Sequence, residues 1–311
     1  GAFSGGGQGG TVLSRLSQEQ IEVVMSSLED GSVTCVSAFA GTGKTSTLRA
    51  LALSRPSKKF LYLAFNVTVR DDATRSFPPN VDAKTLHQLA FATHGYRYAK
   101  NMADQLRVTD VATALEQSLT ERVVPSDSRL VTLAALSVRA LASFFNSIDK
   151  APELAHAQAL STEQQRHRAI YPAHVILGAA ETLWARMKDQ EDDGVAMTMA
   201  GLLKMWSLSR PNLSRQYDAI LLDEAQDAAA PVVSVLLAQQ CALVFVGDPH
   251  QSIYRFAGAA DALTSNSLPV RTRHLALTHC FRFGPSIAHA ANLILVTFKG
   301  EQRPLIGAGS H

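Results

Sequence analysis

Hydrophobic and polar positions along the first 65 residues alternate between helical and strand-like spacing. Residues 16–28 place apolar side chains three or four apart behind Ser17, a helix-start signal. Residues 33–37 form a short β-branched run, which predicts a buried strand. Residues 44–53 predict a second helix, and residues 60–65 predict the next strand. This strand, glycine loop, helix, strand order is a βαβ unit, which predicts a parallel sheet with both faces covered.

The middle of the chain has a different pattern. From about residue 85 to about residue 210 it is rich in Ala and Leu at helical spacing and carries few strand signals. Candidate helices cover residues 108–119, 128–145, 162–170 and 173–188, and a charged loop follows at 190–194. Residues 217–222 and 242–246 then restore the strand pattern. We therefore predict an α/β domain that is interrupted by a helical insertion.

Composition narrows the class of protein. The 311 residues are 46% hydrophobic and 18% charged, with a net charge of +2, which indicates an ordinary globular protein and argues against a histone-like nucleic-acid binder. No apolar run approaches the roughly 18 residues that a membrane span needs. Cys35, Cys241 and Cys280 lie far apart without a CxxC pair, so we expect reduced, buried thiols of an intracellular protein and neither zinc nor a disulfide framework.

The two ends are glycine-rich and have no structural pattern. Residues 1–14 are predicted to be a flexible leader, and the last five residues look similar. Both are expected to be the ends of a fragment, so the sequence carries no readable targeting signal.

A phosphate-binding loop follows the first predicted strand and reads Ala38-Phe-Ala-Gly-Thr-Gly-Lys-Thr45. Backbone amides that surround a phosphate need glycines for unusual dihedral angles and close approach, and the next helix directs its positive end at the same point. In this role Lys44 would reach the β- and γ-phosphates and Thr45 would bind Mg²⁺. Ala38 replaces the usual first glycine. The predicted nucleotide contacts here are Ala40, Gly41, Thr42, Gly43, Lys44, Thr45 and Ser46.

An acidic pair ends the strand at 217–222. Asp223 and Glu224 stand where a magnesium-binding acid belongs in a phosphate-loop protein. We expect Asp223 to hold Mg²⁺ and Glu224 to orient and deprotonate the attacking water. The alternative is a solvated acidic helix start, because acids also favour helix N-termini.

The third motif, Gly247-Asp-Pro-His-Gln-Ser-Ile-Tyr254, follows the strand at 242–246. Gln251 could bond both the γ-phosphate and the water, or it could be an ordinary surface glutamine. Tyr254 and Phe256 flank a cation, which suits base stacking, although an aromatic pair that fills the core is the competing interpretation.

Gln20 is open to two interpretations. Its amide could bind adenine, or it could complete a capping box with Ser17.

Together these segments resemble the superfamily 1 helicases of the UvrD/Rep type, closest to the F-box DNA helicase branch. The resemblance covers nearly the whole chain from Leu16 onward. It rests on the three motifs above and on Leu63-Ala-Phe-Asn66, Phe77-Pro-Pro-Asn-Val81, Lys84-Thr-Leu-His-Gln-Leu-Ala90, Tyr217-Asp-Ala-Ile-Leu-Leu222 and Leu277-Thr-His-Cys-Phe-Arg-Phe-Gly284.

The resemblance implies further roles. Gln20 matches the adenine-reading glutamine, Phe281 an aromatic that stacks on adenine, and Arg282 an arginine that meets the γ-phosphate. The residues that match positions gripping single-stranded DNA are Phe65, Asn66, Thr85, His87, Tyr254 and Phe256. It further implies ATP with Mg²⁺, single-stranded DNA (including strands at a duplex junction) as partner, movement from 3′ to 5′ and a nuclear location. It implies no membrane association. A monomer is the expected state, although the sequence does not report it.

The implied fold is a RecA-like P-loop NTPase sheet with an inserted all-helical subdomain. The first core domain would comprise residues 15–88 and 214–278, the insertion 89–213, and the start of a truncated second core domain 279–311.

Two departures leave an alternative open. The family usually has arginine after the aromatic of the third motif, whereas this chain has Ala257, and the motifs of the second core domain do not follow Arg282. A nucleotide-binding interaction module without motor activity is therefore a second hypothesis, and a P-loop kinase or transporter ATPase is a weaker third. An RNA substrate in place of DNA is a further alternative, because no residue here reports on the 2′-hydroxyl that separates the two.

Overall fold

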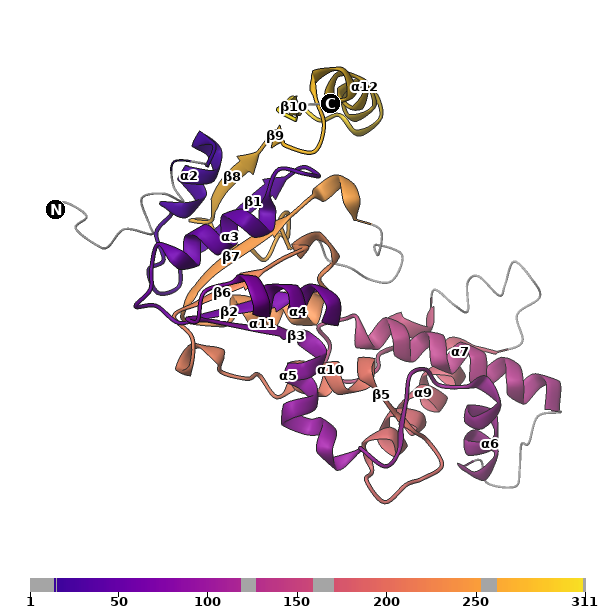
Figure 1. The fold of residues 1–311 in the computed structure, drawn as a ribbon. Helices are drawn as coiled ribbons and strands as arrows, with labels where there is room; N and C mark the ends of the chain where they lie inside the picture. Colours follow the sequence, from indigo (N-terminus) through magenta and orange to yellow (C-terminus); the bar gives the residue numbers. More distant parts are fainter. Residues whose placement is uncertain (1–13, 15, 119–126, 159–170, 253–261, 310–311) are drawn as a thin grey trace. The chain divides into compact units, whose positions relative to one another are not determined.

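The structure, a computed structural model, describes residues 14, 16–118, 127–158, 171–252 and 262–309. It divides into two compact units. Unit 1 comprises residues 1–86 with 212–311, and unit 2 comprises residues 87–211. Figure 1 shows both units as ribbons.

Unit 1 is built on a six-stranded sheet in the order β3-β2-β6-β7-β1-β8. All five neighbouring pairs run parallel, which confirms the predicted α/β class. The strands are β1 (Val33–Ala38), β2 (Phe60–Ala64), β3 (Val81–Thr85), β6 (Ala219–Leu222), β7 (Ala242–Gly247) and β8 (Arg273–Leu277). The four strands from β2 to β1 are almost entirely buried, which explains their near-continuous apolar sequences.

The main core of unit 1 lies between one face of this sheet and three helices. These helices are α2 (Gln18–Val24), α3 (Lys44–Leu53) and α4 (Val67–Ser76). Alternate strand residues such as Tyr62 and Val244 pack with Leu48 of α3 in one buried cluster. A further helix, α11 (Ala230–Leu237), precedes β7, and two short 3₁₀ turns, η3 (Ala225–Asp227) and η4 (Pro249–Gln251), follow β6 and β7.

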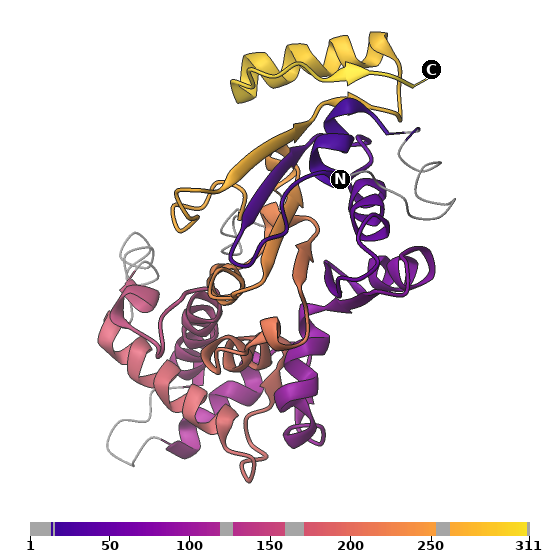
Figure 2. The ribbon, with the colours of Figure 1, turned by 90° about the vertical axis from the view of Figure 1, so that its left-hand side faces the viewer.

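The last part of unit 1 lies at one end of the sheet in both views (Figures 1 and 2). It contains β9 (His279–Cys280), α12 (Pro285–Lys299) and β10 (Ile306–Gly307), and β9 pairs with β10 in parallel. Phe39, Cys280 and Leu305 form a small core there. Because Phe39 comes from the phosphate loop, this second core ties that loop to the C-terminal segment.

Unit 2 is mainly helical. Its helices include α5 (Leu86–His94, which begins at the boundary), α6 (Val108–Ser118), α7 (Asp127–Phe145), α9 (Ala173–Lys188) and α10 (Met199–Leu208). The rings of Phe144, Phe145 and Trp184 meet edge-on or tilted between α7 and α9, with centroids 5.3–5.8 Å apart. Two two-residue strands, β4 (Met102–Ala103) and β5 (Met197–Thr198), pair with each other.

Most predicted elements are confirmed, with shifts at their ends. The helices at 44–53 and 173–188 have the predicted bounds. The helix predicted over 16–28 covers only Gln18–Val24, because Met25 leaves the helical conformation. The strand predicted over 217–222 begins at Ala219, and the helix predicted over 162–170 lies outside the described residues.

The expected burial of the three cysteines is confirmed. All three cysteines are buried and free. No helix among the described residues is long and apolar enough to cross a bilayer.

Candidate nucleotide-binding site

The phosphate loop connects β1 to α3 and depends on two glycines in the left-handed region. Gly41 and Gly43 have φ values of 74° and 81°. A Cβ on Gly41 would lie 2.8 Å from the Arg282 Cβ atom, and one on Gly43 would lie 2.7 Å from Gln20 Nε2. Both positions therefore require glycine for conformation and for space. Helix α3 begins at Lys44, so the free amides of its first turn point to this loop.

The acidic pair lies directly beside the loop. Lys44 Nζ is 3.5 Å from Glu224 Oε2, and the Thr45 hydroxyl donates to Asp223 Oδ2 over 3.3 Å. Glu224 has φ 52°, a left-handed conformation that is strained for a residue with a Cβ. Such strain persists where surrounding contacts hold it, and here it turns the carboxylate toward Lys44. The structure thus brings together the four side chains that the two motifs singled out.

Asp223 is buried and held by Tyr62, a residue outside the three sequence motifs. The Tyr62 hydroxyl donates to Asp223 Oδ2 over 2.6 Å, and the backbone N–H of Glu224 donates to the other oxygen over 3.0 Å. Burial raises the pKa of Asp223, against the lowering effect of the Tyr62 hydrogen bond. Burial and the adjacent Asp223 carboxylate likewise raise the pKa of Tyr62, so its hydroxyl stays a donor.

A buried glutamine joins the second motif to the third. Gln226 Nε2 donates to Glu224 Oε2 over 2.9 Å, and Gln226 Oε1 accepts from the backbone N–H of Asp248 over 3.0 Å. Asp248 Oδ2 in turn accepts from Gln251 Nε2 over 2.6 Å. Gln251, predicted to sense the γ-phosphate, is therefore connected to Glu224 through the Gln226 side chain and through the backbone N–H and carboxylate of Asp248.

Gln20 has the capping-box geometry. The Ser17 N–H donates to Gln20 Oε1 over 3.0 Å, and the Gln20 N–H donates to Ser17 Oγ over 3.2 Å. Its Nε2 also donates to Thr42 O and to Thr47 Oγ1, so both ends of the amide have protein partners and the side chain braces the phosphate loop. The adenine contact remains a prediction.

The other predicted nucleotide contacts surround the loop. Ala40 is partly buried, Thr42 is buried, and Thr45 and Ser46 are exposed at the start of α3. Phe281 and Arg282 are exposed just after β9, and the Phe281 N–H donates to Gly41 O over 2.9 Å. This contact holds the segment that carries both side chains against the phosphate loop.

Of the predicted DNA contacts, Phe65, Asn66 and Thr85 lie at the ends of the neighbouring strands β2 and β3. Phe65 is 46% exposed at the end of β2, and Asn66 Oδ1 caps α4 by accepting from the Val69 N–H. Thr85 is buried at the end of β3, and His87 lies in unit 2 on α5. Tyr254 and Phe256 lie outside the described residues.

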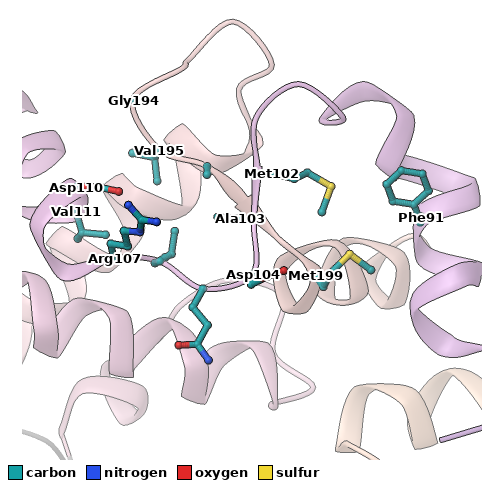
Figure 3. A pocket seen from close by; sticks show the side chains of 13 residues that line it. Phe91, Met102, Ala103, Asp104, Arg107, Asp110, Val111, Gly194, Val195 and Met199 are labelled. Atoms are coloured by element: carbon teal, nitrogen blue, oxygen red, sulfur yellow. The ribbon is translucent and has the colours of Figure 1, made fainter. Parts of the chain in front are cut away.

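Unit 2 has a pocket of about 940 Å³ that contains none of the predicted site residues. In the close view of Figure 3, Met102, Met199 and Phe91 lie on one side of it, and Arg107 and Asp110 lie on the other. Its lining offers no phosphate loop and no paired acids, so it does not change the assignment of the nucleotide site.

Tyr62 and Gln226 carry a weak sequence signal. Tyr62 has the one hydroxyl in the apolar strand Phe60–Ala64, and a buried tyrosine usually needs a hydrogen-bond partner. Gln226 lies within the acidic motif, but nothing in the sequence assigns its two amide ends to different loops.

Comparisons with known proteins show which family the chain resembles. Residues 71–267 match the UvrD/REP helicase N-terminal domain. F-box DNA helicase 1 of Gallus gallus is 34% identical over 301 residues, which cover 94% of this chain and 29% of that protein. F-box DNA helicase protein 1 of Schizosaccharomyces pombe is 34% identical over 303 residues, which cover 94% of this chain and 34% of that protein. The chain thus spans about a third of the length of these relatives.

Proposed function

The chain belongs to the UvrD/REP helicase N-terminal domain family, and we propose that it is part of an ATP-dependent DNA helicase that moves from 3′ to 5′ along single-stranded DNA. The observation that carries this proposal is the meeting of Lys44 with Glu224 and of Thr45 with Asp223 beside a glycine-dependent phosphate loop. Parallel α/β folds place ligands outside the carboxyl ends of their strands, where these residues lie.

Each of these side chains has a distinct part in ATP hydrolysis. The loop amides and the start of α3 bind the phosphates, and Lys44 contacts the β- and γ-phosphate oxygens. Glu224, held by Lys44 and Gln226, orients the attacking water and accepts its proton. Gln251 and Arg282 contact the γ-phosphate. Phe281 and Gln20 contact the adenine.

The residues present fit a magnesium ion. Mg²⁺ is usually bound by one or two carboxylates or hydroxyls together with substrate phosphates, and Thr45 and Asp223 supply such oxygens 3.3 Å apart. When bound, the ion neutralises charge on the phosphates. Tyr62 keeps the Asp223 carboxylate turned to the same place.

The proposed DNA substrate follows from the relatives, whose names describe DNA helicases. Phe65, Asn66, Thr85, His87, Tyr254 and Phe256 would contact the strand. A nuclear location and a monomeric state belong to the same proposal. So does a division into a first core domain (15–88 and 214–278), a helical insertion (89–213) and the start of a second core domain (279–311).

Substitution of the loop lysine tests the nucleotide site. We expect Lys44→Ala to lose nearly all affinity for ATP with Mg²⁺, because the phosphates lose the one side-chain cation of the loop. Arg49→Ala is the matched control, since Arg49 is an exposed cation on the same helix. Fluorescent-nucleotide titration measures both, and equal affinity in Lys44→Ala and wild type would refute the site.

The second candidate is a nucleotide-binding module without motor activity, which Ala257 favours because the family usually has arginine there. ATP hydrolysis by the full-length protein with and without single-stranded DNA separates the two. DNA-stimulated turnover supports the motor, whereas nucleotide binding without stimulation supports the module.

A further inference from the structure

His250 lies in the third motif, beside Gln251, but is not among the residues that the proposed ATPase chemistry uses. Its ring stacks on Phe39 of the phosphate loop, with centroids 5.9 Å apart and planes 13° from parallel. Its Nε2 is 2.7 Å from Glu301 Oε2, in the segment that follows α12. The imidazole therefore contacts the phosphate loop and the C-terminal segment at the same time.

Glu301 is a preorganised partner for this imidazole. Its Oε1 accepts from the backbone N–H groups of Gln302 and Arg303, and the Arg303 guanidinium contacts both carboxylate oxygens. Burial by itself raises the pKa of Glu301, but the hydrogen bonds from Arg303 and His250 outweigh it and hold the pKa at about 2. Glu301 is thus a carboxylate at neutral pH. A carboxylate only accepts, so His250 Nε2 carries the hydrogen.

This pair continues the hydrogen-bonded path that begins at Glu224. The His250 backbone N–H donates to Asp248 Oδ1 over 3.0 Å, and the other Asp248 oxygen accepts from Gln251. The Asp248 N–H donates to Gln226, which contacts Glu224. One connected path therefore runs from the carboxylate beside Lys44, through the loop that carries Gln251, to Glu301.

We propose that His250 and Glu301 are positioning residues for ATP hydrolysis, which fix the loop carrying Asp248 and Gln251 relative to Glu224. The reason is geometric. The turn η4 follows β7 directly and carries Gln251, and the His250 side chain connects this turn to the C-terminal segment. This inference rests on the proposed ATPase, since it assigns no chemistry of its own.

Steady-state ATP hydrolysis by the full-length protein tests it. We expect His250→Ala to lower kcat about tenfold, because small displacements of catalytic groups strongly slow turnover. The KM for ATP should change less than about twofold, since Lys44 and the loop amides remain. His250→Gln keeps an N–H that reaches toward Glu301, and it should recover most of kcat.

The double variant and a matched control sharpen the result. His250→Ala combined with Glu301→Gln should cost little more than the worse single variant, because both remove one link. His274→Ala, an exposed histidine on β8, should leave kcat unchanged. If His250→Ala does not fold, Glu301→Gln carries the test. It should lower kcat at constant KM, because a neutral amide holds the imidazole N–H less strongly than a carboxylate does.

Two failures are distinguishable. If the wild type does not hydrolyse ATP, or Lys44→Ala hydrolyses it normally, the proposed function fails. If the wild type hydrolyses ATP and the folded His250 and Glu301 variants keep full kcat, or if they lose activity only through a raised KM, the positioning role is overturned.

Discussion

Tyr62 offers the sharpest prediction about a single residue. Two side-chain hydroxyls among the described residues donate to Asp223, those of Tyr62 and Thr45. Tyr62→Phe removes one of these hydrogen bonds and leaves a buried carboxylate less well satisfied. We expect a loss of about 1–3 kcal/mol in unfolding free energy by urea denaturation. We also expect a higher Mg²⁺ concentration for half-maximal nucleotide binding, because the carboxylate loses its shortest hydrogen bond and is held less firmly in place.

Tyr217→Phe is the matched control. The Tyr217 hydroxyl also donates to an aspartate, Asp82 Oδ2, over 2.9 Å, but this pair lies at the amino ends of β6 and β3, away from the phosphate loop. Tyr217→Phe should alter stability without altering the Mg²⁺ requirement. Equal Mg²⁺ requirements in Tyr62→Phe and wild type would contradict the role given to Tyr62.

The difference between predicted and unpredicted site residues has a physical cause. Lys44 and Glu224 stand in contiguous motifs whose spacing encodes their place at strand ends, so the sequence was sufficient to select them. Tyr62, Gln226 and Glu301 act through partners far away in the chain, as with Tyr62 and Asp223, 161 positions apart. Their contacts depend on the order and register of strands, which no local pattern specifies.

At the scale of elements, segments with a clear apolar pattern were predicted well, and the two-residue strands were not. The strands at Phe60–Ala64 and Ala242–Gly247 are buried on both faces, and their apolar runs are unambiguous. In contrast, β4 and β5 contain two residues each, too few for any periodicity. The role of Gln20 could not be predicted from the sequence either, because the sequence around it fits both a helix cap and an adenine contact.

The contact between α7 and α10 in unit 2 leads to a prediction about pH. Lys204, 1% exposed on α10, donates to Ser147 O over 2.6 Å and lies 4.2 Å from the Phe144 ring centroid. Burial lowers the pKa of Lys204 from 10.5 to about 8, against the raising effect of Asp149. Between pH 8 and pH 10 the unfolded chain therefore binds more protons at this residue than the folded chain. Under that condition the free energy of unfolding rises with pH.

We expect wild type to gain about 1–2 kcal/mol of stability from pH 8 to pH 10 relative to Lys204→Met, which has no charge to bury. The two tryptophans of the chain, Trp184 and Trp206, both lie in unit 2, so tryptophan fluorescence during urea unfolding reports this unit. Lys150→Met, at an exposed lysine, serves as control and should follow the wild type at every pH. Parallel pH profiles for wild type and Lys204→Met would show that the buried ammonium does not titrate in this range.

At the scale of the molecule, strand order brings together the proposed nucleotide site and a predicted DNA contact. β1, which leads to the phosphate loop, pairs with β7, which leads to Gln251, and β6 between β7 and β2 leads to the acids. β2 leads to Phe65 and pairs with β6. Because all these strands are parallel, their functional ends share one edge of the sheet. Single-stranded DNA bound at Phe65 would thus lie next to the β-strand that leads to the acidic pair.

This arrangement predicts two separable terms in DNA binding. With a net charge of only +2, the chain is not a general polycationic binder, so we expect the proposed DNA binding to come from local phosphate contacts and base stacking. The affinity of the full-length protein for a fluorescent oligothymidine should fall steeply and linearly on a log–log plot against salt, because phosphate contacts release counterions.

Phe65→Ala should weaken binding by about 1–3 kcal/mol at every salt concentration while the slope stays the same, because stacking releases no counterions. Phe298→Ala, at an exposed phenylalanine on α12, should change neither term. Binding that is indifferent to salt would refute the phosphate contacts, and a Phe65→Ala variant with unchanged affinity would remove the stacking role from the end of β2.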